Sequence, residues 1–236
     1  TFPAGTFIPA NGDLIIYGGF PQATPGLYAG FNLSAEGETL SLYDSASNGG
    51  TLLDSITFGL QISDHSISRI NGAWQLSRPT LGNINQAASL GGPSQLRINE
   101  WLSQDVNVFE DEFIELFNPS ELPISLGSLA ISDEPVNYPQ KHSLTQLSFI
   151  APRGFALLTP SGNSADPSAA NELPFRLSSA NEWISLRGTN DVVIDQVHFV
   201  NQRADFSRGR SPDGGNSYQE YVVPTPGYTN NSPLEN

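Results

Sequence analysis

The feature that most constrains the fold of this chain is an internal repeat. Five short sequence blocks recur in the same order, each roughly 140 residues further along the chain. The blocks pair residues 7–12 with 149–154, 31–34 with 175–178, 53–58 with 194–199, 64–69 with 205–210, and 79–82 with 224–227. Because the separation drifts by only a few residues, insertions and deletions fall between the blocks, where loops belong. The repeat predicts two copies of one structural unit.

The two copies are unequal in length. Residues 97–148 have no counterpart before residue 1, so residues 96–231 form a complete copy. Residues 1–86 correspond only to the C-terminal part of such a unit. Residues 87–95 are rich in small and turn-forming side chains, which predicts a linker, and residues 232–236 form a tail.

A unit that lacks some of its strands is expected to expose unpaired strand edges and apolar surface. Three arrangements would resolve this for residues 1–86. The missing strands could lie upstream in a longer protein, they could come from a separate chain or neighbouring subunit, or the partial copy could lean on the complete one. We expect completion by polypeptide outside this chain. Thr1 opens no signal sequence, which predicts a mature or trimmed piece of a longer protein.

Composition and patterning predict an all-β fold. Only 14% of the residues are charged, and 22 glycines and 18 prolines supply many turns. Apolar or alternating runs of about five residues, separated by turn signals, are typical of antiparallel sheets packed as a sandwich. The pattern shows no helix longer than two turns. The alternating positions predicted to face a core are Leu40 and Leu42 in the first copy, and Ile184 and Leu186 in the second.

Charge and residue content exclude several classes of protein. The chain has 24 acidic and 10 basic residues, a net charge of −14, so its field repels phosphate backbones and no nucleic-acid partner is expected. No apolar run reaches the roughly 20 residues of a membrane span. The absence of cysteine excludes a disulfide framework and a thiolate metal site, although it is compatible with secretion.

An ordered set of motifs in the complete copy resembles the lamin tail domain family, in its bacterial secreted form. The motifs are residues 96–100 (LRINE), 111–119 (DEFIELFNP), 124–126 (ISL), 129–133 (LAISD), 150–154 (IAPRG), 176–178 (RLS), 194–195 (ID) and 224–230 (PTPGYTN). Residues 2–85 resemble the second half of the same family. The resemblance implies tandem immunoglobulin-like β-sandwiches, the first incomplete, in a larger secreted or cell-surface bacterial protein.

The sequence departs from the nuclear lamins in two respects. It has no heptad rod, and its charge is strongly negative. A filament or chromatin role is therefore not carried over. The bacterial members of the family are usually accessory modules of multidomain proteins, which implies a spacer, docking or adhesive function rather than a reaction.

No constellation in the sequence predicts catalysis. Nucleophile-elbow, P-loop and dinucleotide-binding motifs are absent, and the three histidines lack metal-ligand spacing. Two of the three carboxyl groups of Glu100, Glu112 and Glu115 could act as an acid/base pair on a glycosidic bond. We favour a structural role, in which Glu115 ties strand ends together by hydrogen bonds. The chain is therefore expected not to be an enzyme.

Acidic loops are the only segments of the sequence that are considered as a cofactor-binding site. Oxygen-rich loops suit Ca²⁺, which takes six to eight oxygen ligands, but no EF-hand pattern is present. Solvated acidic loops are the favoured interpretation, and no other cofactor is expected. If calcium binds, its likeliest ligands by this reasoning are Glu110, Asp111, Glu112, Asp133 and Glu134.

Aromatic residues are the candidate binding residues. Trp183 alternates with Ile184 and is predicted to point outward, where it could stack on a sugar ring or anchor a partner. Contact with the other repeat or the linker is the favoured alternative for this side chain. Trp101, Tyr17 and Tyr28 complete the set.

Two functions remain open from the sequence. The first is a non-catalytic, extracellular adhesive or spacer module, whose partners are other protein domains or a neighbouring chain that completes residues 1–86. The second is a carbohydrate-binding accessory module of a secreted polysaccharide-degrading enzyme, with a glycan as partner.

Overall fold

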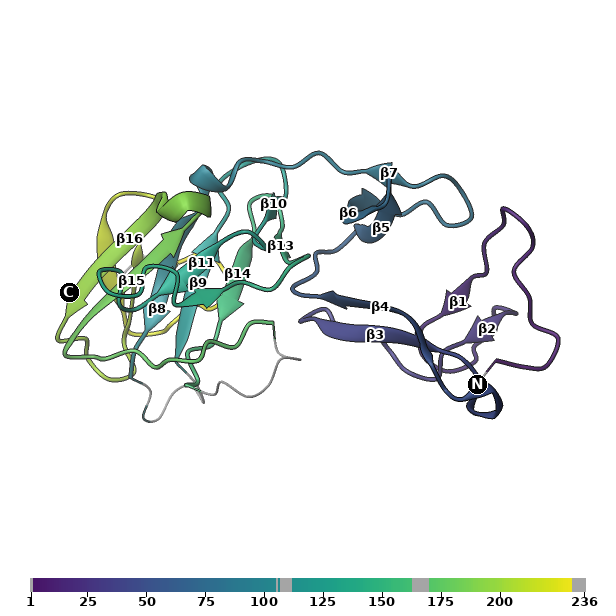
Figure 1. The fold of residues 1–236 in the computed structure, drawn as a ribbon. Helices are drawn as coiled ribbons and strands as arrows, with labels where there is room; N and C mark the ends of the chain where they lie inside the picture. The colour runs from purple at the N-terminus through teal and green to yellow at the C-terminus, as the bar shows by residue number, and fades with distance from the viewer. Residues whose placement is uncertain (1, 105, 107–111, 163–169, 231–236) are drawn as a thin grey trace.

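The computed structural model describes residues 2–104, 106, 112–162 and 170–230. Within these residues the fold is all-β, as predicted, and contains no α-helix. Its helical pieces there are the short 3-10 segments η1 (Ala46–Asn48), η2 (Pro93–Gln95) and η3 (Thr189–Asp191). Figure 1 shows closely layered sheets in the C-terminal half and separate, looser strands in the N-terminal half.

The N-terminal strands form three small sheets that do not join one another. The first pairs β1 (Ile16–Tyr17) with β2 (Leu27–Tyr28), the second pairs β3 (Glu38–Tyr43) with β4 (Leu52–Phe58), and the third orders β5 (Ser66–Ile70), β6 (Ala73–Arg78) and β7 (Gln86–Ala87). The first pair is parallel and the others are antiparallel. Among the described strands, β3 pairs only with β4 and β5 only with β6, so each has one open edge.

The C-terminal strands form two larger antiparallel sheets. Five strands follow the order β14 (Phe155–Leu158), β9 (Phe113–Phe117), β8 (Arg97–Leu102), β17 (Ser207–Arg210) and β18 (Tyr218–Tyr221). Four strands follow the order β12 (His142–Ser143), β11 (Ala130–Ser132), β15 (Asn181–Arg187) and β16 (Val193–Val200). A small third sheet pairs β10 (Ile124–Ser125) with β13 (Phe149–Ile150).

One hydrophobic core lies between these two larger sheets. The five-stranded sheet contributes Ile98 and Ile114, and the four-stranded sheet contributes Ile184, Leu186 and Phe199, all nearly inaccessible to solvent. Burying an aliphatic side chain of this size stabilises the fold by about 1.5–3 kcal/mol. The residues of this core all come from the complete copy, so the described core belongs to that part of the chain.

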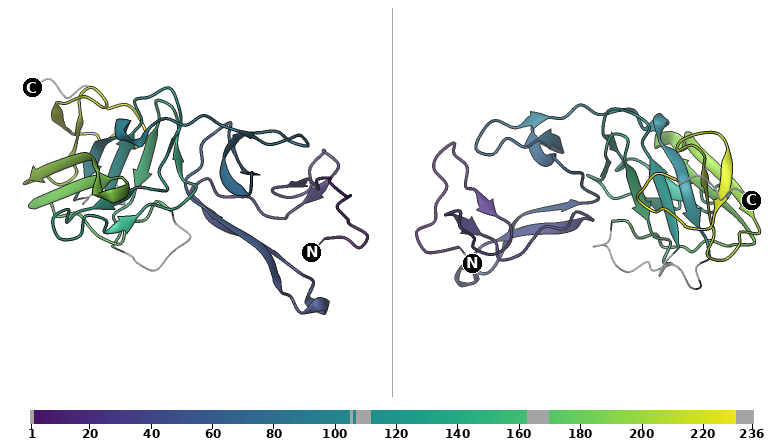
Figure 2. Two further views of the ribbon diagram at one scale, coloured as in Figure 1. Left: turned by 45° about the horizontal axis from the view of Figure 1, so that its top comes forward. Right: turned by 180° about the vertical axis from the view of Figure 1, so that it is seen from behind.

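A short segment after β4 joins the two parts of the molecule. The Gly59 amide donates to the Gln146 carbonyl at 3.2 Å, and the Phe149 amide donates to the Leu60 carbonyl at 2.8 Å. Gln61 Nε2 donates to the Leu147 carbonyl at 2.9 Å, and the Leu60 side chain packs against the main core. The partial copy therefore contacts the complete copy through residues 59–61 (Figure 2). These three residues add no strand to the sheets of the partial copy.

Matched sequence blocks make matched contacts in the two copies. The Ser34 amide donates to Glu38 Oε1 at 2.5 Å, and the Ser178 amide donates to Glu182 Oε2 at 3.0 Å. A parallel bridge joins Tyr17 to Tyr28, and another joins Thr159 to Glu172. Local geometry thus follows the sequence repeat, even where the surrounding sheets differ.

The predicted inward-facing positions separate the two copies. Ile184 and Leu186 are fully buried, as predicted. The prediction for Leu40 and Leu42 is wrong, because these side chains are 38% and 45% exposed. They alternate in β3 as the counterparts alternate in β15, but no second sheet lies opposite them among the described residues.

Candidate functional site

The complete copy contains two glutamates on neighbouring strands. Glu100 on β8 stands directly opposite Glu115 on β9 in the strand register, and both side chains are fully buried. Both carboxyl groups lie in the protein interior, out of contact with solvent. A buried carboxyl group must instead be satisfied by donors from the protein.

The donors come largely from β17 and from the turn near the C-terminus. Glu100 accepts hydrogen bonds from the Ser207 hydroxyl, from the Thr225 amide at 3.1 Å and from Thr225 Oγ1 at 2.9 Å. Glu115 accepts from the Gly227 amide at 2.7 Å. Asn99 Nδ2 also donates to Glu115, at 2.8 Å. Glu115 is thus a buried, hydrogen-bonded carboxyl group that joins the middle of β9 to β8 and to the turn at Gly227.

Burial changes the ionisation of both carboxyl groups. Loss of hydration and, to a smaller extent, the charges of Glu100 and Asp213 raise the pKa of Glu115 to about 8, against an ordinary value of 4.5. Loss of hydration also raises the pKa of Glu100. Because desolvation outweighs the donated hydrogen bonds, the folded state favours a protonated Glu115 at neutral pH.

A second pair of side chains, Asp195 and Arg210, binds the backbone of β8. Asp195 Oδ2 accepts the Ile98 amide at 2.8 Å, and Arg210 Nε donates to the Ile98 carbonyl at 2.8 Å. Arg210 Nη2 lies 2.8 Å from the same Asp195 oxygen, in a largely buried ion pair. This clamp binds the backbone N–H and C=O of one residue of β8, and the donors around Glu100 bind a side chain two residues further on.

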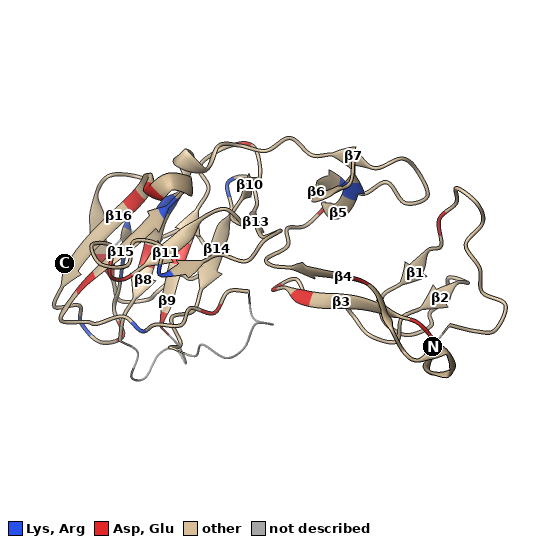
Figure 3. Cartoon of the chain, viewed as in Figure 1, with Lys and Arg blue, Asp and Glu red and all other residues tan. Residues whose placement is uncertain are grey.

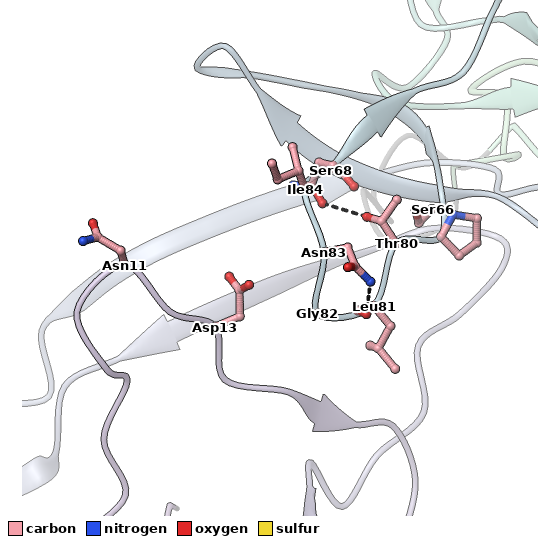
Figure 4. Close-up of a pocket in the computed structure, with 11 residues that line it drawn as sticks. Asn11, Asp13, Ser66, Ser68, Thr80, Leu81, Gly82, Asn83 and Ile84 are labelled. Atoms are coloured by element: carbon pink, nitrogen blue, oxygen red, sulfur yellow. Dashed lines mark hydrogen bonds between the residues drawn. The ribbon is translucent and has the colours of Figure 1, made fainter.

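The partial copy contains the corresponding cradle without its glutamates. An open pocket of about 710 Å³ is lined by Ser66, Thr80 and Gly82, the repeat counterparts of Ser207, Thr225 and Gly227 (Figure 4). Asn11, Asp13 and Ser68 lie at the same pocket. The strands that supply the two glutamates in the complete copy have no counterpart among residues 2–86.

The frame of the cradle has the same internal bonds in both copies. Thr80 Oγ1 donates to Asn85 Oδ1 at 3.2 Å, and the equivalent Thr225 bond to Asn230 measures 3.1 Å. Asn85 Nδ2 donates to the Arg69 carbonyl at 3.3 Å, as Asn230 does to Arg210 at 2.8 Å. The frame is therefore already formed in the partial copy.

The two copies differ in whether the groups that bind β8 in the complete copy have hydrogen-bond or ion-pair partners. The amides of Thr80 and Gly82 have no hydrogen-bond partner within the described part of the chain. Asp54 and Arg69, the counterparts of Asp195 and Arg210, are exposed and form no ion pair among the described residues.

The aromatic candidates do not gather at one place. Trp101 is only 2% exposed and packs against Phe199 at 5.5 Å between ring centres, so its ring is part of the interior and offers no face to a ligand. This corrects its selection as a binding residue. Trp183 is 38% exposed and stacks on His198 at 4.3 Å.

Tyr17 and Tyr28 form a half-buried pair with ring centres 5.4 Å apart. They lie on the β1–β2 sheet, whereas Trp183 lies on the four-stranded sheet of the complete copy. The outward aromatic residues thus belong to separate sheets and do not share one platform.

The acidic loops are occupied by protein partners where they are described. Lys141 Nζ lies 2.8 Å from Asp133 Oδ1 and 2.9 Å from Glu134 Oε1, so its single positive charge offsets one of these two negative charges. Glu112 Oε2 accepts the Leu177 amide at 3.0 Å. Glu110 and Asp111 lie outside the described residues. Figure 3 shows acidic positions spread over both parts of the chain, and no described group of three or more potential ligands could hold a metal ion.

The cradle and clamp residues were present in the repeat but had no role assigned by sequence reasoning. Ser66, Arg69 and residues 79–82 match the second copy in the same order, as part of the repeated blocks. That match is the signal that could have identified them. Their chemistry becomes visible only from the contacts that Ser207, Arg210 and Thr225 make with β8.

Within the described residues, no helix is long and apolar enough to cross a membrane. Comparisons with protein-family models, with curated proteins and with solved structures found no match.

Proposed function

We propose that this chain is a non-catalytic interaction module of a larger secreted or cell-surface protein, in which residues 1–86 bind a partner polypeptide by strand addition. In this proposal both copies are lamin-tail-like, immunoglobulin-like sandwiches, and the first becomes complete only when the partner supplies its missing strands. Two sheets that share one core in the second copy support the sandwich architecture.

The observation that carries the proposal is the contrast between matched apolar faces. Leu40 and Leu42 are exposed, whereas their counterparts Ile184 and Leu186 are buried. In the complete copy, β11 pairs with the edge of β15 that corresponds to the open edge of β3. Open edges next to exposed apolar residues favour addition of an extended segment, since it supplies both backbone partners and apolar cover.

Hydrogen exchange tests this proposal directly. The full chain is mixed with a separate synthetic polypeptide that has the sequence of residues 96–148, the segment missing from the first copy. Amides of β3 and β5 are expected to exchange more slowly in the mixture, because strand addition pairs their open edges. A polypeptide of the same composition in scrambled order is the control.

Unchanged exchange at β3 and β5 with the ordered polypeptide would contradict strand addition. A titration with neutral and acidic glycans, followed by the fluorescence of Trp183 and compared with a Trp183→Phe variant, separates this proposal from carbohydrate binding. Under the proposal the glycans leave the exchange of β3 and β5 unchanged.

A further inference from the structure

We infer that the pocket around Ser66, Thr80 and Gly82 is a receptor for a glutamate on a partner β-strand that adds antiparallel to the open edge of β5. This inference rests on the proposed function and specifies the partner at that site. The partner is a polypeptide strand with an apolar–Asn–Glu sequence, of the kind that residues 98–100 provide in the complete copy.

The first argument is the chemistry of the cradle. In the complete copy the amide and hydroxyl of Thr225 and the hydroxyl of Ser207 all donate to Glu100. In the partial copy Thr80 and Ser66 line the open pocket at the equivalent positions. Their hydroxyls contact Asn85 Oδ1 and Ser77 Oγ, while the Thr80 amide has no partner in the described part of the chain. A carboxyl group accepts several hydrogen bonds at once, so it is the side chain that matches these donors.

The second argument is the clamp, which binds backbone and not a side chain. Asp195 and Arg210 bind the N–H and the C=O of residue Ile98 in the complete copy. Asp54 on β4 and Arg69 on β5 are their counterparts in the repeat; both are exposed and form no ion pair with each other in the described structure. A carboxylate accepts a backbone N–H and a guanidinium donates to a backbone C=O, so this residue pair suits one residue of an incoming strand.

The third argument is the register. In the complete copy Gly209 of β17 stands opposite Glu100, and Arg208 stands opposite Trp101. The repeat places Ser68 and Ile67 of β5 at these two positions. A strand added in the same register therefore presents its apolar residue to the clamp and its glutamate to the cradle at the same time.

Two substitutions distinguish the open cradle from the filled one. Ser68 stands in place of Gly209, where an added Cβ would come within 2.7 Å of Asn230 Nδ2, 3.0 Å of the Asn99 carbonyl oxygen and 3.2 Å of Glu100 Cγ. Asp13 lies at the open pocket and adds a negative charge to its rim. Both substitutions narrow the set of strands that fit, and the β8 sequence is the direct probe of whether its glutamate is still accepted.

A second copy of this chain is a poor occupant. Its own β8 lies between β9 and β17, and its Glu100 is fully buried. Donating that strand would require the second copy to open its five-stranded sheet and expose the core behind it. The occupant we assign is accordingly a polypeptide strand other than the β8 of a second copy.

The test compares two synthetic polypeptides with the sequence of residues 96–148, one unchanged and one carrying Glu100→Gln. Each is titrated calorimetrically into the full chain, and exchange of β5 amides is followed in parallel. We expect the Gln form to bind at least tenfold more weakly, because its amide group places hydrogen atoms against the cradle donors. The chain variant Thr80→Val should weaken the unchanged polypeptide similarly, while Thr51→Val, on an exposed turn, should not.

The outcomes separate the two levels of the proposal. Equal affinity of the Glu and Gln forms, with β5 still protected, would overturn the glutamate receptor and leave strand addition standing. Failure of both forms to bind or to protect β5 would overturn the receptor together with the proposed function. Protection of β5 through dimerisation of the chain alone, seen by sedimentation, would also overturn the receptor.

Discussion

Residues 2–87 and residues 96–230 share the clamp residues, the cradle and the alternating apolar strand positions. The two regions differ in whether a strand of the chain occupies the clamp and the cradle. In the complete copy the Asp195–Arg210 clamp binds the backbone N–H and C=O of Ile98. The alternating residues Ile184 and Leu186 pack against a second sheet. In the partial copy the same positions face solvent or an open pocket. The comparison teaches that a repeated sequence preserves turns and hydrogen-bonded corners, while burial depends on strands supplied from elsewhere.

The largest expected difference concerns the two clamp arginines. Arg210→Met should lower the free energy of unfolding by about 3–5 kcal/mol, because it leaves the Asp195 carboxylate and the Ile98 carbonyl without their partner. The matched change Arg69→Met should cost less than about 0.5 kcal/mol, since Arg69 is exposed. Urea unfolding followed by tryptophan fluorescence measures both. Equal losses of unfolding free energy in the two variants would contradict this difference between Arg210 and Arg69.

The buried glutamates predict a pH dependence confined to the complete copy. The folded state holds the Glu115 proton up to a pKa of about 8, whereas the unfolded chain releases it near 4.5. Folded protein then binds more protons than unfolded protein between these values, so this stabilisation is complete below pH 4.5 and is lost as pH rises through about 8. The slope approaches about 1.4 kcal/mol per pH unit, the value for one proton.

Glu115→Gln removes the titrating group, so its unfolding free energy should change less steeply over that pH window than that of the unchanged chain. Urea unfolding at several pH values between about 5 and 8 tests this linkage. Parallel curves for the two proteins would show that Glu115 does not carry the proton.

The core positions give a further matched pair. Ile184→Ala should destabilise the protein by about 2–4 kcal/mol, because it leaves a cavity between two packed sheets. Leu40→Ala should change stability by no more than about 0.5 kcal/mol, since the leucine is exposed in the chain alone. Adding the polypeptide of residues 96–148 should make the Leu40→Ala cost larger, and an unchanged cost in its presence would argue against a shared buried face.

The smallest expected effect concerns the junction between the copies. A Cβ at Gly59 would collide with the Ser148 side chain, so Gly59→Ala should weaken the contact that seats Leu60 against the core. The loss is expected to be about 1 kcal/mol, the value of a partly buried leucine. Gly18→Ala, where an added Cβ has no close neighbour, is the control. Limited proteolysis between the copies should accelerate only in the Gly59 variant.

Much of the strand content followed from the sequence. Alternation over residues 183–186 identified β15 and its buried face. The same reasoning failed for Leu40 and Leu42, because alternation shows which face is apolar and not whether anything covers it. The site was harder to predict, since Ser66 and Thr80 become a cradle only through comparison with contacts that Glu100 makes across about 100 residues of sequence.

The sequence by itself determined the all-β class, the repeat and the positions of the matched turns, because these depend on local alternation and on turn-forming residues. Only the tertiary structure decided which apolar faces are buried, that Trp101 belongs to the interior, and that one cradle is filled while the other is open. Those properties depend on which strands lie side by side in space, and neighbouring strands such as β8 and β17 are distant in the chain.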